Sequence, residues 1–245
     1  MSANDIQILI LCAGKGVRLK TNLPKSLIKI SDDNLLDHHL KNCSTLNLSP
    51  ITLITGFRKD LFNNYNLKTI FNPRWNSSNM VHSLFLAKDL ISTCKTIVLY
   101  GDIAISSGDL RKLVVSNKDF DVLFDLDWKS YWLKRFENPL EDLESFQIGP
   151  TGVLKKIGGK ADSLSQIQGQ YIGAFSLTPA GAAVFFNTWQ SMENMNVASV
   201  TEVMSKIIEN GSMEIHGTPL YDPWLEIDFP RDIEIAKNII KTIPT

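Results

Sequence analysis

Ile8-Leu-Ile-Leu-Cys-Ala-Gly-Lys-Gly-Val-Arg-Leu19 joins an apolar run to a loop that contains glycine and positive charge. The run from Ile8 to Leu11 has no polar alternation, which is typical of a strand buried on both faces of a parallel sheet. Gly14 and Gly16 lack the Cβ that would keep backbone amides away from phosphate oxygens. The stretch therefore predicts a buried strand of an α/β fold, followed by a loop that binds polyphosphate.

The loop differs from two common phosphate-binding loops. A Walker loop requires Gly-x-x-x-x-Gly-Lys-Ser/Thr, whereas Lys15 stands between the two glycines here. A dinucleotide fingerprint requires a third glycine or alanine at position 19, which is leucine, and an acidic residue at the end of the second strand. The second predicted strand instead continues into Gly56-Phe57. The sequence therefore gives little support to a P-loop ATPase or a dehydrogenase.

Length, charge and cysteine content limit the class of protein. The chain has 245 residues, 44% of them hydrophobic, which predicts a single domain over 1–245. The net charge of −1 provides no general attraction for nucleic acid, so anion binding must be local. Cys12, Cys43 and Cys94 lack metal-site spacing and form an odd set, which favours a reducing compartment. Residues 1–7 are too short and polar for a signal peptide, and no apolar run approaches a membrane span, so we expect a cytoplasmic protein without a membrane partner.

Strand and helix patterns alternate along the chain, which predicts βαβ units and a parallel sheet. Strands are expected at 6–11, 51–55, 68–71, 96–99, 121–125, 171–177, 213–217 and 224–228, and helices at 34–46, 58–64, 79–90, 109–116, 179–193, 200–209 and 230–243. A less regular stretch, about 127–170, carries glycine, proline and charges and is expected to form an inserted lobe. Asp102 follows the strand at 96–99 and should lie at the carboxyl edge of the sheet, where ligands gather in such folds.

The glycine loop resembles the signature of the nucleotidyltransferases that activate sugar phosphates, phosphocholine and phosphonates. That signature is A-x-G-x-G-x-R-L followed by P-K-x-L. Ala13 to Leu19 and Pro24 to Leu27 carry the match, with Cys12 and Ala13 standing where the family often has two alanines. The segment Trp224-Leu-Glu-Ile-Asp228 also resembles the closing motif of the family. The resemblance implies a Rossmann-like, GT-A-type fold with three layers, a mostly parallel central sheet and a small inserted lobe. Only five residues separate Arg18 from Pro24, fewer than in many members of the family.

The resemblance also implies roles for individual residues. Asp102 and Asp228 correspond to the family's magnesium ligands, and Mg²⁺ commonly takes one or two carboxylates together with phosphate and water. A turn cap and a helix cap are the respective structural alternatives for these two aspartates. The catalytic residues implied are Arg18, Lys25, Asp102 and Asp228.

The nucleotide is expected to bind to the glycine loop and to a helix near residue 80. Asn79 and Ser83 lie four residues apart and share one helix face. Their segment is similar to the one that surrounds the base in phosphocholine and phosphonate cytidylyltransferases, which implies CTP. The nucleotide-binding residues predicted are Leu11, Ala13, Gly14, Lys15, Gly16, Asn79 and Ser83.

The acceptor is expected to bind to the inserted lobe and its flanks. Aromatic side chains alternate there with acidic ones and could receive an ammonium group, or could form the core of the lobe; they are Trp128, Tyr131, Trp132, Phe136 and Phe146. The acceptor-binding residues predicted are Asp127, Glu144, Lys160, Gln170, Tyr171 and Glu226.

These observations predict a Mg²⁺-dependent cytidylyltransferase that transfers CMP from CTP to a small phosphorylated or phosphonate acceptor and releases pyrophosphate. The acceptor would resemble phosphocholine, aminoethylphosphonate or a phosphorylated amino acid. A sugar-1-phosphate nucleotidyltransferase is the alternative. Two further classes are a glycosyltransferase that uses Asp125-Leu-Asp127 as its metal motif and a nucleotide-binding protein without turnover. The sequence leaves open whether the protein forms a homodimer.

Overall fold

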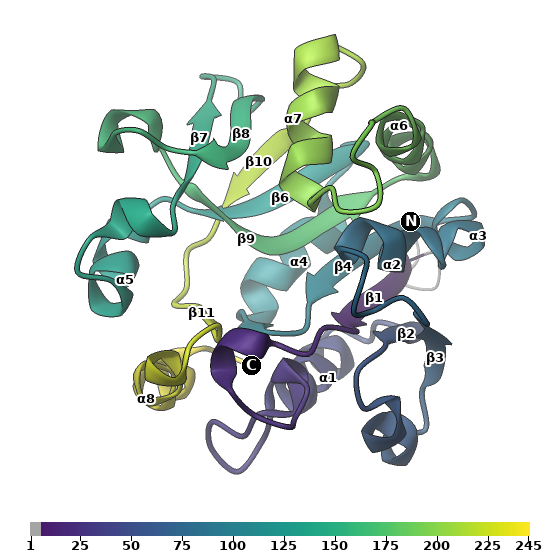
Figure 1. Cartoon of the computed structure of the whole chain (residues 1–245), viewed down its shortest axis with the longest axis vertical. Helices are drawn as coiled ribbons and strands as arrows, with labels where there is room; N and C mark the ends of the chain where they lie inside the picture. The colour runs from purple at the N-terminus through teal and green to yellow at the C-terminus, as the bar shows by residue number, and fades with distance from the viewer. Residues whose placement is uncertain (1–5) are drawn as a thin grey trace.

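A computed structural model describes residues 6–245 of the protein, in which helices cover both faces of a seven-stranded sheet (Figure 1). The strand order is β10-β6-β9-β4-β1-β2-β3. Neighbouring strands are parallel except at β9, which runs antiparallel to both β4 and β6. The predicted three-layer fold with a mostly parallel sheet is therefore confirmed. Residues 1–5, most of the segment expected not to be a signal peptide, lie outside the described range.

The elements follow one another in the alternating order that the sequence predicts. The main sheet contains β1 (Ile6–Cys12), β2 (Ile51–Thr55), β3 (Lys68–Phe71), β4 (Lys95–Tyr100), β6 (Phe120–Asp125), β9 (Gln170–Leu177) and β10 (His216–Pro219), while β5 (Ile103–Ala104) pairs with β11 (Leu225–Glu226) and β7 (Glu144–Ile148) with β8 (Leu154–Lys160). The α-helices are α1 (Leu35–Thr45), α2 (Met80–Phe85), α3 (Lys88–Ile91), α4 (Ser107–Val115), α5 (Trp128–Arg135), α6 (Pro179–Gln190), α7 (Val200–Asn210) and α8 (Pro230–Ile239). None of the helices among residues 6–245 is long and apolar enough to cross a membrane.

Strand β1 is buried along its whole length, as its apolar run predicts. Ile8 and Ile10 face a core that includes residues of α1 and α4, whereas Leu9 and Leu11 face a second core that includes residues of α2, α6 and α7. Successive side chains of a strand point to opposite faces, so burial on both faces requires an apolar residue at every position. This burial explains why the run shows no alternation.

Three predicted elements differ from the structure. Residues 58–64 were expected to form an α-helix, and the chain forms a 3₁₀ helix at Lys59–Tyr65 instead. The helix expected at 79–90 is divided into α2 and α3, because the Ala87 N–H donates to the Leu84 carbonyl and tightens the last turn of α2. The strand expected at 213–217 begins at His216, because the carbonyl of Ile215 accepts a hydrogen bond from Leu154 of the β7–β8 hairpin.

The region expected to form an inserted lobe, about 127–170, consists of two parts that pack on different elements. Helix α5 packs against α8, whereas strand β8 packs against α7. Its aromatic side chains belong to the two main cores: Trp128, Tyr131, Trp132 and Phe136 on one side of the sheet, and Phe146, stacked on Phe124, on the other. Of the two roles that the sequence left open for these aromatic residues, the structure assigns them to the core.

Polar side chains fix the starts of several helices. Asn34, Ser106, Thr178 and Ser199 each accept the backbone N–H three residues later, at the beginning of α1, α4, α6 and α7 respectively. Helix α8 begins differently, because the carboxylate of Asp232 accepts the backbone N–H groups of Asp228 and Phe229. Asp232 therefore caps α8, which leaves the side chain of Asp228 free for another role.

Candidate active site

A cavity of about 580 Å³ opens beside the carboxyl ends of β1 and β4. The loop after β1, the turn after β4 and the segment that leads into α2 line it. Its lining includes every residue predicted to bind the nucleotide, namely Leu11, Ala13, Gly14, Lys15, Gly16, Asn79 and Ser83, as well as Arg18, Lys25 and Asp102. The structure thus brings the glycine loop and the predicted base-binding helix to one cavity.

Two glycines beside the cavity, Gly16 in the glycine loop and Gly101 in the turn after β4, leave no room for a Cβ atom. Gly16 has a φ of 62°, and a Cβ there would lie 2.6 Å from the Cγ atom of Lys25. A Cβ on Gly101 would lie 2.6 Å from the carbonyl oxygen of Leu11. A 3₁₀ turn at Val17–Leu19 then reverses the short connection toward Pro24. The shortened loop therefore still delivers both Arg18 and Lys25 to the cavity.

Three carboxylates meet at the edge of the cavity. Asp102, Glu226 and Asp228 each place a carboxylate oxygen within 4.8 Å of the other two. Pairing of β5 with β11 brings them together, because Glu226 lies opposite Ile103 and the N–H of Ile227 donates to the carbonyl of Asp102. Asp102 and Asp228 thus lie side by side, as predicted, and Glu226, predicted to bind the acceptor, lies beside them.

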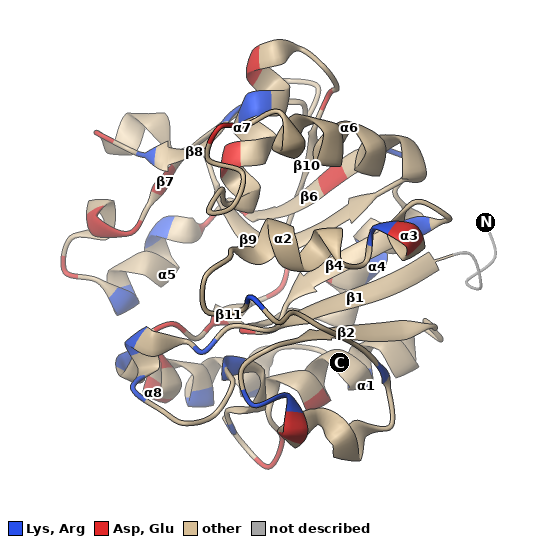
Figure 2. Ribbon diagram, turned by 45° about the vertical axis from the view of Figure 1, so that its right-hand side comes forward, with Lys and Arg blue, Asp and Glu red and all other residues tan. Residues whose placement is uncertain are grey.

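Two cations lie against these carboxylates. The Nζ atom of Lys25 is 2.7 Å from Oδ2 of Asp102 and also pairs with Oδ1 of Asp228. The Nη2 atom of Arg18 is 2.9 Å from Oδ1 of Asp228, and its guanidinium lies over the ring of Phe229. Basic and acidic segments accordingly lie close together near β11 in Figure 2.

The site is strongly coupled electrostatically. Burial alone would lower the pKa of Lys25, but the carboxylates of Asp102 and Asp228 raise it above its ordinary value. Burial would raise the pKa of Asp228, and the opposing charges of Lys25, Arg18 and Arg135 bring it below its usual range. Burial and the neighbouring Asp228 raise the pKa of Glu226 to about 8. Lys25 is thus charged and Asp228 ionised at neutral pH.

The donor set agrees with a divalent metal. Mg²⁺ prefers oxygen ligands, and these carboxylates provide them beside a cavity of nucleotide size. Asp232 lies behind the cluster, so four carboxylates face the charges of Lys25, Arg18 and Arg135. A bound cation would favour the ionised form of Glu226 and would offset the one negative charge by which four ionised carboxylates exceed the three cations.

Arg135 and Asp232 were missed by the sequence interpretation. The Nη1 atom of Arg135 is 2.7 Å from Oε2 of Glu226, and its Nε and Nη2 atoms are each 3.2 Å from the carboxylate of Asp232. The only local signal was a basic residue at the end of an aromatic-rich helix. Such a pattern is also typical of a surface helix.

The segment that leads into α2 is held by the buried side chain of Asn72. Its Nδ2 atom donates to the hydroxyls of Ser83, at 2.9 Å, and Ser78, at 3.1 Å. Asn79 accepts from the N–H of Met80 and donates to the carbonyl of Val197, at 3.0 Å, so part of its hydrogen-bonding capacity is used within the protein. Trp75 also lines the cavity, although the sequence analysis did not select it.

Apart from Glu226, which lies in the carboxylate cluster, the residues predicted to bind the acceptor are separated into two groups. Glu144, Gln170 and Tyr171 lie together, since Gln170 donates to the carbonyl of Glu144 and the ring of Tyr171 meets that of Tyr100, which lines the cavity, at 5.9 Å. The buried hydroxyl of Tyr171 has no hydrogen-bond partner among residues 6–245.

The other group lies at the surface, and neither group contributes to the lining of the cavity. Asp127 is exposed and accepts a hydrogen bond from Ser130 within its own turn, while Lys160 is exposed at the end of β8. Neither residue contributes to the lining of the cavity. The structure therefore gives no support to an acceptor role for Asp127 or Lys160, because α5 and the β7–β8 hairpin direct these residues to the surface.

Residues 8–124 match the MobA-like NTP transferase domain, the part of the chain that contains the glycine loop, Lys25 and Asp102. The matched part of the chain is thus a nucleotidyltransferase domain. CTP:phosphoglutamine cytidylyltransferase of Campylobacter jejuni is 28% identical in an alignment of length 252. The alignment covers 93% of this chain and 97% of that protein. The bifunctional protein GlmU of Buchnera aphidicola is 32% identical over 122 residues, which cover 48% of this chain and 27% of that protein.

Solved structures share the fold of this nucleotidyltransferase over its whole length. The inositol-1-phosphate CTP transferase of T. maritima superposes with a TM-score of 0.73 at 18% identity and covers 98% of each chain. The CTP:phosphocholine cytidylyltransferase LicC of Streptococcus pneumoniae gives a TM-score of 0.70 at 16% identity, over 96% of this chain and 99% of LicC. The resemblance stated from the sequence is thereby confirmed, and with it the Rossmann-like fold.

Proposed function

We propose that this nucleotidyltransferase is a Mg²⁺-dependent cytidylyltransferase that transfers CMP from CTP to a small phosphorylated acceptor and releases pyrophosphate. The observation that carries the proposal is the position of Lys25, Asp102 and Asp228 beside a cavity lined by the glycine loop. The preference for CTP is supported by the relative that acts on phosphoglutamine, which aligns with nearly the whole chain.

The reaction requires alignment and charge neutralisation rather than a strong base. An oxygen of the acceptor phosphate attacks the α-phosphorus, and the bond from that phosphorus to the oxygen of the leaving pyrophosphate breaks. The attacking oxygen is already anionic near neutral pH, because the second pKa of a phosphate ester is about 6. The residues of the site therefore need to orient two anions against each other and reduce their repulsion.

The charged residues fit this task. Mg²⁺, held by Asp102 and Asp228 with Glu226 as an additional oxygen donor, would supply positive charge to the reacting phosphates. Lys25 would move from the carboxylates to the α-phosphate or the acceptor. Arg18, which is 49% exposed and adjoins the glycine loop, would bind the leaving phosphates.

We propose that the acceptor binds between the carboxylate cluster and β9. Glu144, Gln170 and Tyr171 lie there, and the hydroxyl of Tyr171 has no partner within the described chain. Acidic groups next to a phosphate-transfer site suit an acceptor that carries an amine as well as a phosphate. A phosphorylated amino acid combines both groups, in agreement with the acceptor named for the Campylobacter jejuni relative.

The structure argues against the glycosyltransferase alternative. The Oδ2 atom of Asp125 accepts the indole N–H of Trp224 at 2.9 Å, and its Oδ1 atom accepts the N–H of Asp127. The carboxylate of Asp127 accepts from Ser130. Both carboxylates of the Asp-x-Asp motif therefore serve local structure. A sugar-1-phosphate acceptor is the second candidate, because the signature that the glycine loop resembles is shared by nucleotidyltransferases that activate sugar phosphates.

A matrix of four NTPs against phosphorylated amino acids, phosphocholine, aminoethylphosphonate and hexose 1-phosphates, with pyrophosphate detection, tests the proposal. We expect release with CTP and an amine-bearing phosphorylated acceptor, and loss of at least about a hundredfold in Asp102→Asn. Asp89→Asn, an exposed change on α3, is the matched control and should retain activity. Preference for UTP and a sugar 1-phosphate would favour the second candidate, a sugar-1-phosphate nucleotidyltransferase. Near wild-type release by Asp102→Asn would refute the metal assignment.

A further inference from the structure

The side chain of Arg135 is fully buried behind the carboxylate cluster, with 0% of its surface exposed. An arginine is rarely buried in this way unless it is paired, because removal of its charge from water is costly. We propose that Arg135 is a positioning residue that orients Glu226 and Asp228 as metal ligands. This inference rests on the proposed function and assigns a task to a residue outside the matched family domain, which ends at residue 124.

Arg135 shares one carboxylate with the backbone that carries Asp228. Its Nε and Nη2 atoms donate to the two oxygens of Asp232, and Oδ2 of Asp232 also accepts the N–H groups of Asp228 and Phe229, each at 2.8 Å. A guanidinium binds a carboxylate in a planar, two-pronged geometry that fixes the orientation of both groups. The position of the Asp228 backbone is therefore tied to the plane of the Arg135 guanidinium.

The contacts leave the oxygens that a metal would need available. Nη1 of Arg135 donates to Oε2 of Glu226 at 2.7 Å, so Oε1 is not used by this contact. Nη2 lies 3.9 Å from Oδ2 of Asp228, which is beyond hydrogen-bond distance. Arg135 thus lowers the repulsion between the carboxylates and holds Glu226 directly, without occupying Asp228.

Aromatic side chains of α5, and Phe136 directly after it, surround the guanidinium. The guanidinium carbon lies 5.4 Å from the ring centres of Tyr131 and Trp132 and 5.3 Å from that of Phe136. The hydroxyl of Tyr131 also accepts the N–H of Glu226 at 2.9 Å, which joins α5 to β11. The aromatic cluster that could have received an ammonium group of the acceptor thus surrounds a cation of the protein itself.

Arg135→Lys keeps the positive charge but removes the two-pronged geometry, so it tests positioning separately from charge. Loss of an outer partner of a metal ligand typically weakens metal binding by about 10–100-fold. We expect that range for the Kd of Mn²⁺ in the presence of CTP, measured by electron paramagnetic resonance. The KM for CTP should change less than the Mn²⁺ Kd, because the cavity lining does not include Arg135.

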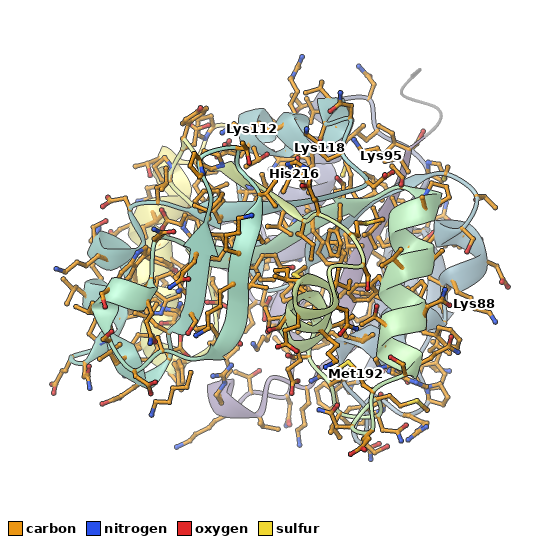
Figure 3. All side chains as sticks on the ribbon, turned by 90° about the horizontal axis from the view of Figure 1, so that it is seen from above. Lys88, Lys95, Lys112, Lys118, Met192 and His216 are labelled. Atoms are coloured by element: carbon orange, nitrogen blue, oxygen red, sulfur yellow. The ribbon has the colours of Figure 1, made fainter. Side chains whose placement is uncertain are left out.

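Lys95→Met is the control for the disturbance of a buried, hydrogen-bonded cation away from the site. The Nζ atom of Lys95 donates to the carbonyls of Leu113, Val114 and Ser116, at the opposite end of β4 from Asp102. Figure 3 labels Lys95 close to Lys118, which follows α4 in the chain. This variant should lower the melting temperature and leave the Mn²⁺ Kd unchanged.

Two results would overturn the inference: a Mn²⁺ Kd of folded Arg135→Lys within about twofold of the wild-type value, or an equal change in Lys95→Met. If Arg135→Lys does not fold, Asp232→Asn provides the second test, because it keeps Arg135 but replaces the shared carboxylate with an uncharged amide. The same loss of Mn²⁺ affinity is expected there, and an unchanged Kd would refute the inference. Mn²⁺ binding is measured without turnover. A failure of the inference about Arg135 can therefore be told apart from a failure of the proposed function, which would show as an absence of pyrophosphate release.

Discussion

Replacement of Lys25 by methionine is expected to strengthen the binding of a free divalent cation while it impairs catalysis. Nζ of Lys25 lies 2.7 Å from Oδ2 of Asp102 and pairs with Oδ1 of Asp228, two of the oxygens proposed to bind the metal. A metal ion that arrives without nucleotide must therefore displace an ammonium group. When CTP arrives with the metal, its phosphates offer Lys25 an alternative partner.

The size of the effect follows from the geometry. Two unit charges about 4 Å apart interact by about 4 kcal/mol at an effective dielectric constant of about 20. Lys25 is 18% exposed, and Arg18 continues to neutralise Asp228. We therefore expect removal of Lys25 to strengthen metal binding by about a third of this interaction energy. About 1.4 kcal/mol corresponds to a tenfold tighter Kd. Catalysis should fall by about 10²–10³, as for the loss of one group that stabilises a developing charge.

Mn²⁺ titrations without nucleotide, followed by electron paramagnetic resonance, measure the first effect, and pyrophosphate release measures the second. Lys15→Met is the matched control, because Lys15 is exposed in the same loop and lies over the ring of Phe57, with no ion pair among the described residues. It should leave the affinity for free Mn²⁺ unchanged. A folded Lys25→Met protein that binds free Mn²⁺ no more tightly than the wild type would refute this reasoning.

Two further predictions concern His39 and Tyr171, which both contact Tyr100 at the end of β4. Burial, followed by the charge of His38, lowers the pKa of His39 from 6.5 to about 3, so the unfolded chain binds this proton more tightly. The folded state should lose about 1 kcal/mol of stability through His39 between about pH 6.5 and 5.5, and denaturant unfolding of His39→Gln should lack this component; an identical pH dependence would contradict the assignment. Tyr171→Phe removes a buried hydroxyl that has no partner among residues 6–245, so unfolding stability should change by less than about 0.5 kcal/mol, while the KM for the acceptor rises about tenfold. An unchanged acceptor KM would place the acceptor elsewhere.

The parts of the fold that the sequence predicts depend on local patterns. The apolar run of β1 and the glycine loop are contiguous in sequence, and the conformation of each residue in them depends on its neighbours along the chain. The meeting of Asp102 with Asp228 depends instead on β5 and β11, which contain two residues each. The short alternation at 224–228 predicts a strand but not its partner, and β5 carries no periodic signal, so only the family resemblance could pair these aspartates.

Arg135 shows why the remainder of the site could not be predicted. Its neighbours in α5 give the pattern of a helix with an aromatic face, and the role of the guanidinium arises only when α5 packs against α8. Tertiary packing, of α5 against α8 and of β8 against α7, also leaves Asp127 and Lys160 exposed, although the sequence predicts that they bind the acceptor. Residues that act through tertiary packing leave no spacing in the chain from which their task could be inferred.

The three cations of the site differ in how freely they can move, and this order matches the tasks proposed for them. Arg135 is 0% exposed and bound on three sides, so it can hold carboxylates but cannot follow a substrate. Lys25, at 18%, has a flexible side chain that can exchange carboxylates for a phosphate. Arg18, at 49%, lies nearest to solvent, where pyrophosphate must leave. A charge that moves during the reaction has to be less tightly enclosed than the charges that stay, and the burial of these side chains follows that requirement.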